Sequence, residues 1–346
     1  MKKALVISGG GSKGAFSVGV LKSLQTWDFH ADFDIYVGTS TGSLIIPLAA
    51  MGAIDQLEKL YTNYQTKDIL QKGNVGNLAL TNSISIFGFA PLKSILEEIY
   101  DDEFFDELNQ SNKEIYLTTV CLQTQEIVVF TNAKNPVQGS YYRIETLKDG
   151  AQFRAAVLAS ASQPVFTPPV KINEKISGSP HANFQYVDGG VREYAGVMIA
   201  VEAGADNILT IIHSSQMKPV QQIVFKNMFE VLQQTLELFL TDVGENDMYV
   251  PRLFNNGLEY IDQVKEKMRS AGVSDALIDS YFNIDHNNLY QNRKPIRMHL
   301  IRPLQLLSGG PGGLVFDPAE MKNMLVAGET SFLTYAAHFT TDNFWA

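Results

Sequence analysis

The sequence predicts an α/β protein in which a central, mostly parallel β-sheet is covered by helices on both faces, as a three-layer sandwich. Two consecutive units carry this prediction, because residues 4–24 and 35–51 each join an apolar strand to a helix through a small-residue turn. Further strand-like runs follow at 114–130, 186–187 and 207–212, with helical stretches between them. This alternation is typical of a parallel sheet.

The composition fits a globular chain with a sizeable core. Of its 346 residues, 45% are hydrophobic and 18% are charged, and the formal net charge is −10. An acidic chain without a cluster of Lys and Arg argues against a nucleic-acid partner, and any transient contact with a membrane surface should be mainly apolar. The single cysteine, Cys121, excludes an internal disulfide framework and is expected to be a small core residue.

Targeting signals are not evident in the sequence. The apolar run at residues 4–7 is too short for the core of a signal peptide. No run approaches the roughly 20 apolar residues of a membrane-spanning helix. We therefore expect a cytoplasmic location, while export without a cleaved signal stays open.

The first unit contains a glycine loop that could bind an anion. Residues 9–14, Gly-Gly-Gly-Ser-Lys-Gly, follow a strand and lead into a helix, so their backbone N–H groups are available to a negative group. The loop matches the dinucleotide pattern G-x-G-x-x-G, but Asp34 stands before the second strand rather than at its end. A P-loop would need Ser or Thr after Lys13, where Gly14 stands. The interpretation of the loop as an oxyanion hole conflicts with neither the position of Asp34 nor the presence of Gly14.

The second unit contains the G-x-S-x-G pattern of a nucleophile elbow. Residues 38–42 read Gly-Thr-Ser-Thr-Gly and lie between a buried strand and an apolar helix. Gly38 and Gly42 would let the strand and the helix approach closely, while the sharp turn exposes the Ser40 hydroxyl. The N-terminus of the helix that follows this turn would direct free N–H groups at a developing negative charge.

The glycine loop at 9–14 and the elbow at 38–42 together resemble the paired signatures of patatin-like phospholipases. The resemblance is specific over residues 4–212 and weak over 294–330. It implies that the glycine loop is the oxyanion hole and that the elbow serine is the nucleophile. It also implies a catalytic Ser–Asp dyad without histidine, whose aspartate lies in Asp-Gly-Gly or Asp-Gly-Ala.

Asp188, Gly189 and Gly190 supply that third motif after the short strand 186–187. Functional groups collect at the carboxyl ends of parallel strands, so we expect Asp188 to lie beside Ser40. A carboxylate within reach of a serine hydroxyl can take its proton and later return it.

The predicted site hydrolyses a carboxylic ester of a lipid, as a phospholipase A or lysophospholipase does, through an acyl-enzyme and without metal or cofactor. Ser40 is the expected nucleophile and Asp188 the expected proton acceptor and donor. The oxyanion hole is expected from Gly9, Gly10, Gly11, Ser12, Gly14 and Thr41. The expected supporting residues are Lys13, Gly38, Gly42, Gly189 and Gly190. Lys13 could act through its charge or through a salt bridge that fixes the loop.

Three alternatives are open at this stage. The histidines that follow Asp188 in the order of an α/β-hydrolase triad are His213, His286, His299 and His338. However, Ser40 lies on only the second strand, and His213 and His299 are expected to be hydrogen-bonded structural residues. The chain could also be a nucleotide-binding oxidoreductase that uses the glycine loop. Finally, it could be a catalytically silent lipid-binding protein of the same fold.

The chain divides into a catalytic core at 1–216, a helical insertion or lid at 217–293, and a return to the core at 294–346. In the insertion, we expect helical structure at 220–240, 258–268 and 275–282. The apolar side chains of the first of these are expected to face the core. The return contains a strand near 296–302 and a helix from 319 to 327 that Asp317 caps. Upstream, the apolar residues Ile86, Phe87 and Phe89 either pack in the core or line an acyl pocket.

Overall fold

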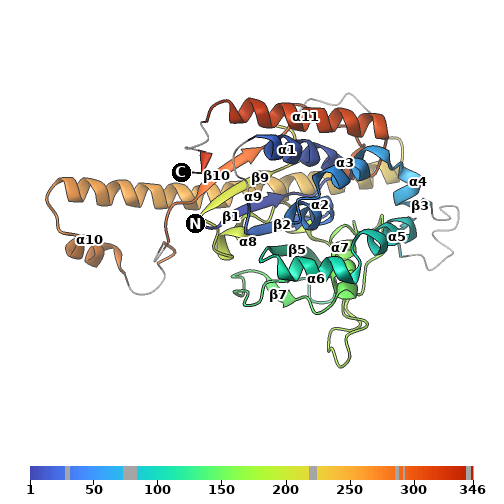
Figure 1. The fold of residues 1–346 in the computed structure, drawn as a ribbon, viewed down its shortest axis with the longest axis horizontal. Helices are drawn as coiled ribbons and strands as arrows, with labels where there is room; N and C mark the ends of the chain where they lie inside the picture. The colour runs from blue at the N-terminus through green and yellow to red at the C-terminus, as the bar shows by residue number, and fades with distance from the viewer. Residues whose placement is uncertain are drawn as a thin grey trace.

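An eight-stranded, mostly parallel sheet forms the centre of the described chain, as predicted (Figure 1). The computed structural model describes residues 1–27, 32–72, 84–217, 224–284, 288–290, 293–339 and 344–345. The strand order is β10-β9-β1-β2-β5-β6-β7, and β8 pairs with β5. The strands are β1 (Lys3–Ile7), β2 (Ile35–Thr39), β5 (Glu114–Cys121), β6 (Ile127–Thr131), β7 (Arg143–Thr146), β8 (Tyr186–Asp188), β9 (Asn207–Ile211) and β10 (Arg297–Ile301). A separate hairpin pairs β3 (Gln71–Lys72) with β4 (Phe87–Gly88).

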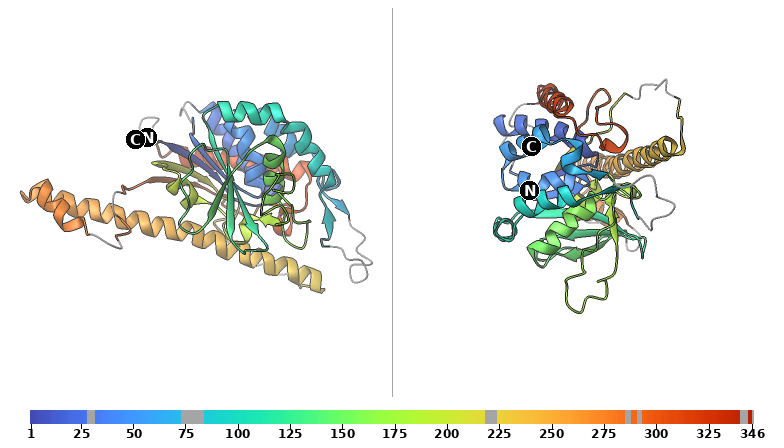
Figure 2. Two further views of the ribbon diagram at one scale, coloured as in Figure 1. Left: turned by 90° about the horizontal axis from the view of Figure 1, so that it is seen from below. Right: turned by 90° about the vertical axis from the view of Figure 1, so that its right-hand side faces the viewer.

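Helices cover both faces of the sheet, which gives the predicted three layers (Figure 2). Alternate residues of β1 divide between two apolar cores: Leu5 and Ile7 pack with α1, α2 and α11, whereas Ala4 and Val6 pack with α8. The longer helices are α1 (Gly14–Thr26), α2 (Thr41–Ala50), α3 (Ile54–Asn63), α5 (Ala90–Ile99), α6 (Asp102–Gln110), α7 (Gly150–Ser160), α9 (Met228–Ser270), α10 (Asp275–Phe282) and α11 (Pro318–Ala336). The shorter ones are α4 (Thr66–Ile69) and α8 (Val197–Glu202).

The register of the central strands places the two glycine-containing turns side by side. In the parallel pair of β1 and β2, Ile7 lies opposite Gly38, so the loops that follow both strands emerge at the same edge of the sheet. On the other side of β2, Thr39 lies opposite Thr118 of β5. The residues expected to carry the chemistry therefore leave the sheet at its centre.

The helical stretches predicted at 220–240 and 258–268 belong to one continuous helix, α9, which begins at Met228 and also includes residues 241–257. A Cβ at Gly244 would lie 2.7 Å from the ring of Tyr194, so this glycine allows α9 to pack closely on Tyr194. The predicted helix at 275–282 is confirmed as α10.

The apolar side chains at the start of the insertion face outward rather than into the core, contrary to our expectation. Met228 is 88% exposed, Val224 is 81% exposed, and Val231 and Phe239 are also exposed. Residues 220–223, the start of the predicted helix, lie outside the described residues. The division of the chain at 216 and 293 stays a prediction. None of the described helices is long and apolar enough to cross a membrane.

The last helix, α11, crosses α1 at very close range. A Cβ at Gly328 would overlap the backbone carbonyl oxygen of Phe16, and a Cβ at Gly19 would overlap that of Leu325. The predicted helix from 319 to 327 is therefore confirmed but extends to Ala336, with Gly328 in its interior. Asp317 caps it as expected, since its carboxylate accepts hydrogen bonds from two N–H groups of the first turn.

Replacing Gly328 with Ala should lower the free energy of unfolding by about 1–3 kcal/mol, because the added methyl group forces the two helices apart. Helix propensity alone predicts the opposite sign, a gain of about 1 kcal/mol. Urea unfolding followed by circular dichroism measures the difference. Gly88→Ala is the control, since a Cβ there meets nothing closer than 3.4 Å. A Gly328→Ala protein as stable as the parent would contradict the close crossing.

Candidate active site

Ser40 occupies the strained turn expected of a nucleophile elbow. It is the single residue between β2 and α2, with φ 55° and ψ −120°. Residues other than glycine rarely adopt such a backbone conformation, because it costs on the order of 1–3 kcal/mol. The turn fits because α2 packs directly on β1: a Cβ at Gly42 would overlap the carbonyl oxygen of Ile7. Only glycine at position 42 allows this approach.

Two buried serines that sequence reasoning missed hold the elbow in place. The backbone N–H of Ser40 donates to Ser160 Oγ at 3.0 Å. Ser43 Oγ donates to the carbonyl of Gly38 at 2.7 Å and lies 2.7 Å from Ser160 Oγ. Ser160 is the last residue of α7 and is followed by the proline-containing segment 161–169.

Asp188 reaches Ser40 from an antiparallel strand, whereas the sequence argument assumed a parallel one. β8 runs antiparallel to β5, with Asp188 opposite Thr119, and Thr118 is in turn opposite Thr39. The end of β8 therefore comes back to the level at which β2 ends. The buried carboxylate of Asp188 accepts a hydrogen bond of 2.7 Å from the N–H of Gly190, and the Ser40 side chain lies close enough to lower the pKa of this carboxyl group.

Burial raises the pKa of Asp188 from 3.8 to about 6, and the polar contacts with Ser40 and Gly190 oppose this rise. The carboxyl group is thus mostly ionised at neutral pH, yet its pKa lies close to neutral. A group with such a pKa can both accept and return a proton near neutral pH.

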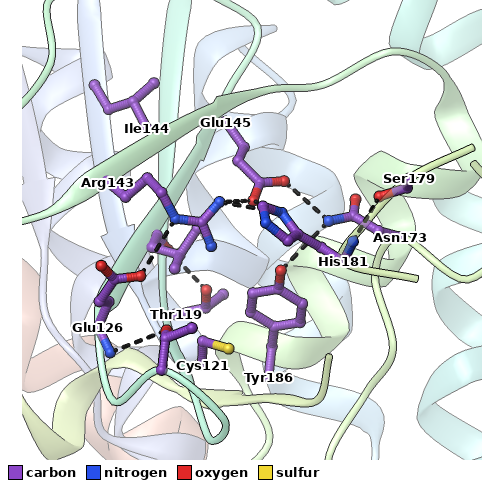
Figure 3. Close-up of polar contacts among 12 residues, drawn as sticks. Thr119, Cys121, Glu126, Arg143, Ile144, Glu145, Asn173, Ser179, His181 and Tyr186 are labelled. Atoms are coloured by element: carbon purple, nitrogen blue, oxygen red, sulfur yellow. Dashed lines mark hydrogen bonds and ion pairs between the residues drawn. The ribbon is translucent and has the colours of Figure 1, made fainter. Parts of the chain in front are cut away.

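A polar network anchors the strand that carries Asp188 (Figure 3). Tyr186, two residues earlier on β8, accepts a hydrogen bond of 3.3 Å from Asn173 Nδ2, which also donates to Glu145 Oε2 at 2.9 Å. Glu145 further contacts Arg143 and, at 3.2 Å, His181 Nδ1. These contacts connect β8 to β7 and to residues 173–181, which precede β8 in the chain. They limit the movement of Asp188.

The glycine loop beside Ser40 has some N–H groups engaged and others free. Gly9 N–H donates to the carbonyl of Tyr194 at 3.2 Å, and Gly14 N–H donates to carbonyls within the loop, so neither is available to an oxyanion. The N–H groups of Gly10, Gly11 and Thr41 have no acceptor among the residues that the structure describes. Ser12 is buried and is not one of the residues lining the cavity beside Ser40.

A cavity of about 140 Å³ connects these groups with an apolar interior. Ser40, Thr41, Asp188 and the glycine loop line its polar end. The side chains that line the rest are largely apolar, among them Leu44, Leu60, Ile69, Leu70, Phe89, Leu92, Ile95, Leu96, Ile99 and Leu314. Phe89 of the apolar loop thus lines the cavity, whereas Ile86 and Phe87 are not among its lining residues. Such a cavity suits a hydrocarbon chain whose polar end lies at Ser40.

A comparison with models of protein families identifies the family of this chain. The family model described as patatin-like phospholipase matches residues 5–201, more than half of the chain. The chain belongs to the patatin-like phospholipase family. Membership supports lipid hydrolase activity in general and agrees with the resemblance found in the sequence.

Two further similarities were found for this patatin-like chain. A cUMP-AMP-activated phospholipase from Escherichia coli is 30% identical over 110 residues, which are 31% of this chain and 31% of that relative. The match therefore spans less than a third of the relative. The crystal structure of VipD from Legionella pneumophila aligns with 97% of this chain and 67% of that chain, at 12% identity and a TM-score of 0.45.

In this patatin-like site, Lys13 forms a salt bridge across the cavity. Its Nζ lies 3.4 Å from Glu237 Oε1 of α9, and Glu237 Oε2 accepts a hydrogen bond of 2.9 Å from the N–H of Gly312. Glu237 thereby joins the glycine loop to a second glycine-rich segment near the C-terminus. Of the two roles considered for Lys13, this contact favours fixing the loop.

The histidines form no triad in the described part of the site. His213 and His299 are both buried and hydrogen-bonded, the latter to Tyr335 and to the carbonyl of Phe344. No described histidine has a hydrogen bond to Ser40 or Asp188, while His286 lies outside the described residues. Within the same residues, no group of three His, Cys, Asp or Glu side chains could hold a metal ion. Cys121 is buried and free, as expected.

Replacing Asp188 with Asn should stabilise the protein at neutral pH. A carboxyl group whose pKa is raised on folding favours the fold while protonated, and this contribution is lost as the pH rises through about 6. A rise of this size in the pKa corresponds to roughly 3 kcal/mol of stability. The free energy of unfolding of Asp188→Asn should therefore equal that of the parent below pH 4. The difference in favour of the variant should grow between pH 4 and pH 6 and stay constant above pH 6. Urea unfolding of both proteins at several pH values tests this, and an advantage independent of pH would contradict it.

Proposed function

We propose that this chain is a lipid acyl hydrolase that cleaves a carboxylic ester, as a phospholipase A or lysophospholipase does. The observation that carries the proposal is that Ser40, on its strained turn, and the buried carboxylate of Asp188 lie beside each other in one cavity, where the Ser40 side chain lowers the pKa of Asp188. Both groups line a cavity whose other lining side chains are largely apolar. A hydroxyl, a base and a space for a hydrocarbon chain are the parts that this reaction requires.

The proposed reaction has two steps. Ser40 Oγ attacks the ester carbonyl while its proton passes to Asp188, and the tetrahedral intermediate then releases the alcohol, which takes that proton. The product is an acyl-enzyme on Ser40. Water attacks the acyl group in the same way, with Asp188 again accepting the proton and returning it to Ser40 as the fatty acid leaves.

The free N–H groups of Gly10, Gly11 and Thr41 are the proposed oxyanion hole. Gly10 and Gly11 come from the loop after β1 and Thr41 from the first turn of α2, so the donors reach the carbonyl oxygen from two sides. Each donor of this kind contributes on the order of 3 kcal/mol to transition-state stabilisation. Gly9 and Gly14 are not part of this proposal, since their N–H groups are engaged within the protein.

We also propose that α9 acts as a lid and that its start contacts the lipid surface. Glu237, Leu240 and Thr241 of α9 line the cavity, while Val224 and Met228, just before and at the start of the same helix, are highly exposed. With a net charge of −10, apolar side chains are the means by which this chain can contact lipid.

Covalent labelling tests the proposed chemistry. A fluorophosphonate should modify the intact protein at Ser40, as read by peptide mass spectrometry, because the activated hydroxyl attacks phosphorus as it attacks a carbonyl. Ser40→Ala should not be labelled, and Asp188→Asn should release fatty acid from phospholipid at least 10³-fold more slowly. Full labelling of Ser40→Ala would reject the mechanism.

The same experiment separates the alternatives. A catalytically silent lipid-binding protein would bind phospholipid without releasing fatty acid. A nucleotide-binding oxidoreductase would bind a dinucleotide and remain unlabelled by the fluorophosphonate.

Charged substitutions at the start of α9 test the lipid contact. Val224→Asp with Met228→Asp should weaken binding to phosphatidylcholine vesicles at least five-fold, because two exposed apolar side chains lose their favourable transfer into lipid. Hydrolysis of a soluble short-chain ester should be unchanged. Tyr281→Asp on α10, at a side chain that is 60% exposed, is the matched control. Equal weakening in the control would show that added charge alone causes the effect.

A further inference from the structure

His213 is a buried residue beside the glycine loop, and the proposed reaction gives it no task. It follows β9, and its side chain contacts the loop after β1 and the helix that follows it. Its Nδ1 lies 2.8 Å from the carbonyl oxygen of Gly9, and its Nε2 lies 2.7 Å from Ser17 Oγ on α1. Its backbone N–H donates to Ser8 Oγ at 3.1 Å. The ring is therefore fixed at both nitrogens.

The contacts of Nδ1, which also lies 3.2 Å from Ser8 Oγ, indicate which nitrogen carries the proton. A carbonyl oxygen only accepts hydrogen bonds, so Nδ1 must donate to Gly9. Burial lowers the pKa of His213 to about 4, so the ring is neutral near pH 7 and Nε2 carries no proton. Nε2 then accepts the hydroxyl proton of Ser17. The ring thus directs one fixed donor at the carbonyl of Gly9.

Holding that carbonyl also orients the next N–H group. The C=O and N–H of a trans peptide point in opposite directions, and the described chain has no cis peptide bond. With the Gly9 carbonyl turned toward His213, the N–H of Gly10 points away from the ring. A Cβ on Gly9 would lie 3.2 Å from Ser40 Cβ, so this peptide lies directly against the nucleophile.

A peptide between two glycines needs such a restraint. Without side chains, Gly9 and Gly10 can rotate the peptide plane with little steric cost. The ring packs so closely that a Cβ on Gly10 would lie 2.7 Å from His213 Nδ1. Ser8 Oγ adds a second donor to the same carbonyl at 3.2 Å.

We propose that His213 is a positioning residue, which holds the Gly9–Gly10 peptide so that the N–H of Gly10 is directed at the oxyanion formed on attack by Ser40. This inference rests on the proposed hydrolase function and deepens it. His213 has no hydrogen bond to Ser40 or Asp188, and in this proposal it transfers no proton. It acts on the transition state through the orientation of one peptide.

Two substitutions of His213 test the proposal, because each places an amide nitrogen at the position of a different ring nitrogen. In His213→Asn, the amide nitrogen takes the place of Nδ1 and can still donate to Gly9. In His213→Gln, it reaches the place of Nε2 and leaves Gly9 without this donor. We expect His213→Gln to lose about 10²-fold in kcat at unchanged KM, as for the loss of one oxyanion donor. His213→Asn should stay within about ten-fold of the parent, and Ser17→Ala should change kcat little.

Active-site titration with a fluorophosphonate counts the folded sites, so kcat is expressed per reactive Ser40. An equal loss in His213→Asn and His213→Gln, or a parental kcat in His213→Gln, would overturn the inference. Failure of the proposed function is a distinct outcome, since the parent protein would then show no labelling and no turnover. In the parent protein itself, nitrogen NMR of the ring should show the proton on Nδ1. A proton on Nε2 alone would also overturn the inference, whether or not the variants fold.

Discussion

The left-handed backbone at Ser40 is the constraint on which the rest of the site depends. Its strain persists only because the surroundings hold it: α2 packs on β1 at Gly42, and Ser160 binds the N–H of Ser40. The same turn places the hydroxyl beside Asp188 and leaves the N–H of Thr41 free at the start of α2. Fold and proposed chemistry therefore share one local interaction, the close contact between β1 and the β2–α2 turn.

The burial of the cavity and of Asp188 is the second constraint on the site. The apolar side chains that line the cavity suit an acyl chain, and the burial of Asp188 makes its carboxylate less stable and hence more basic. The network of Glu145, Asn173 and Tyr186 anchors the strand that carries this carboxylate. A raised pKa and a fixed position are what a base needs in order to accept a proton from serine near neutral pH.

Sequence reasoning found the parts that local patterns determine. Most strands of the central sheet, the elbow at Ser40 and the cap at Asp317 follow from short-range residue types, whereas β7 and the hairpin of β3 and β4 were not predicted; the family match supports the overall assignment. The rest depends on tertiary contacts. Tyr194 engages the N–H of Gly9, β8 runs antiparallel to its neighbour, and α9 continues through Pro251. All three features depend on partners distant in sequence or on packing. The outward-facing apolar side chains near Met228 carry a helical pattern that does not reveal what covers them.

A crystal structure of the protein after reaction with a fluorophosphonate tests the central claim most directly, because the phosphonyl group mimics the tetrahedral intermediate. The account predicts phosphorus bonded to Ser40 Oγ, with the phosphonyl oxygen about 2.7–3.1 Å from the backbone nitrogens of Gly10 and Gly11. The alkyl group should lie in the apolar cavity. An adduct on another residue, or an oxygen directed away from the glycine loop, would contradict it.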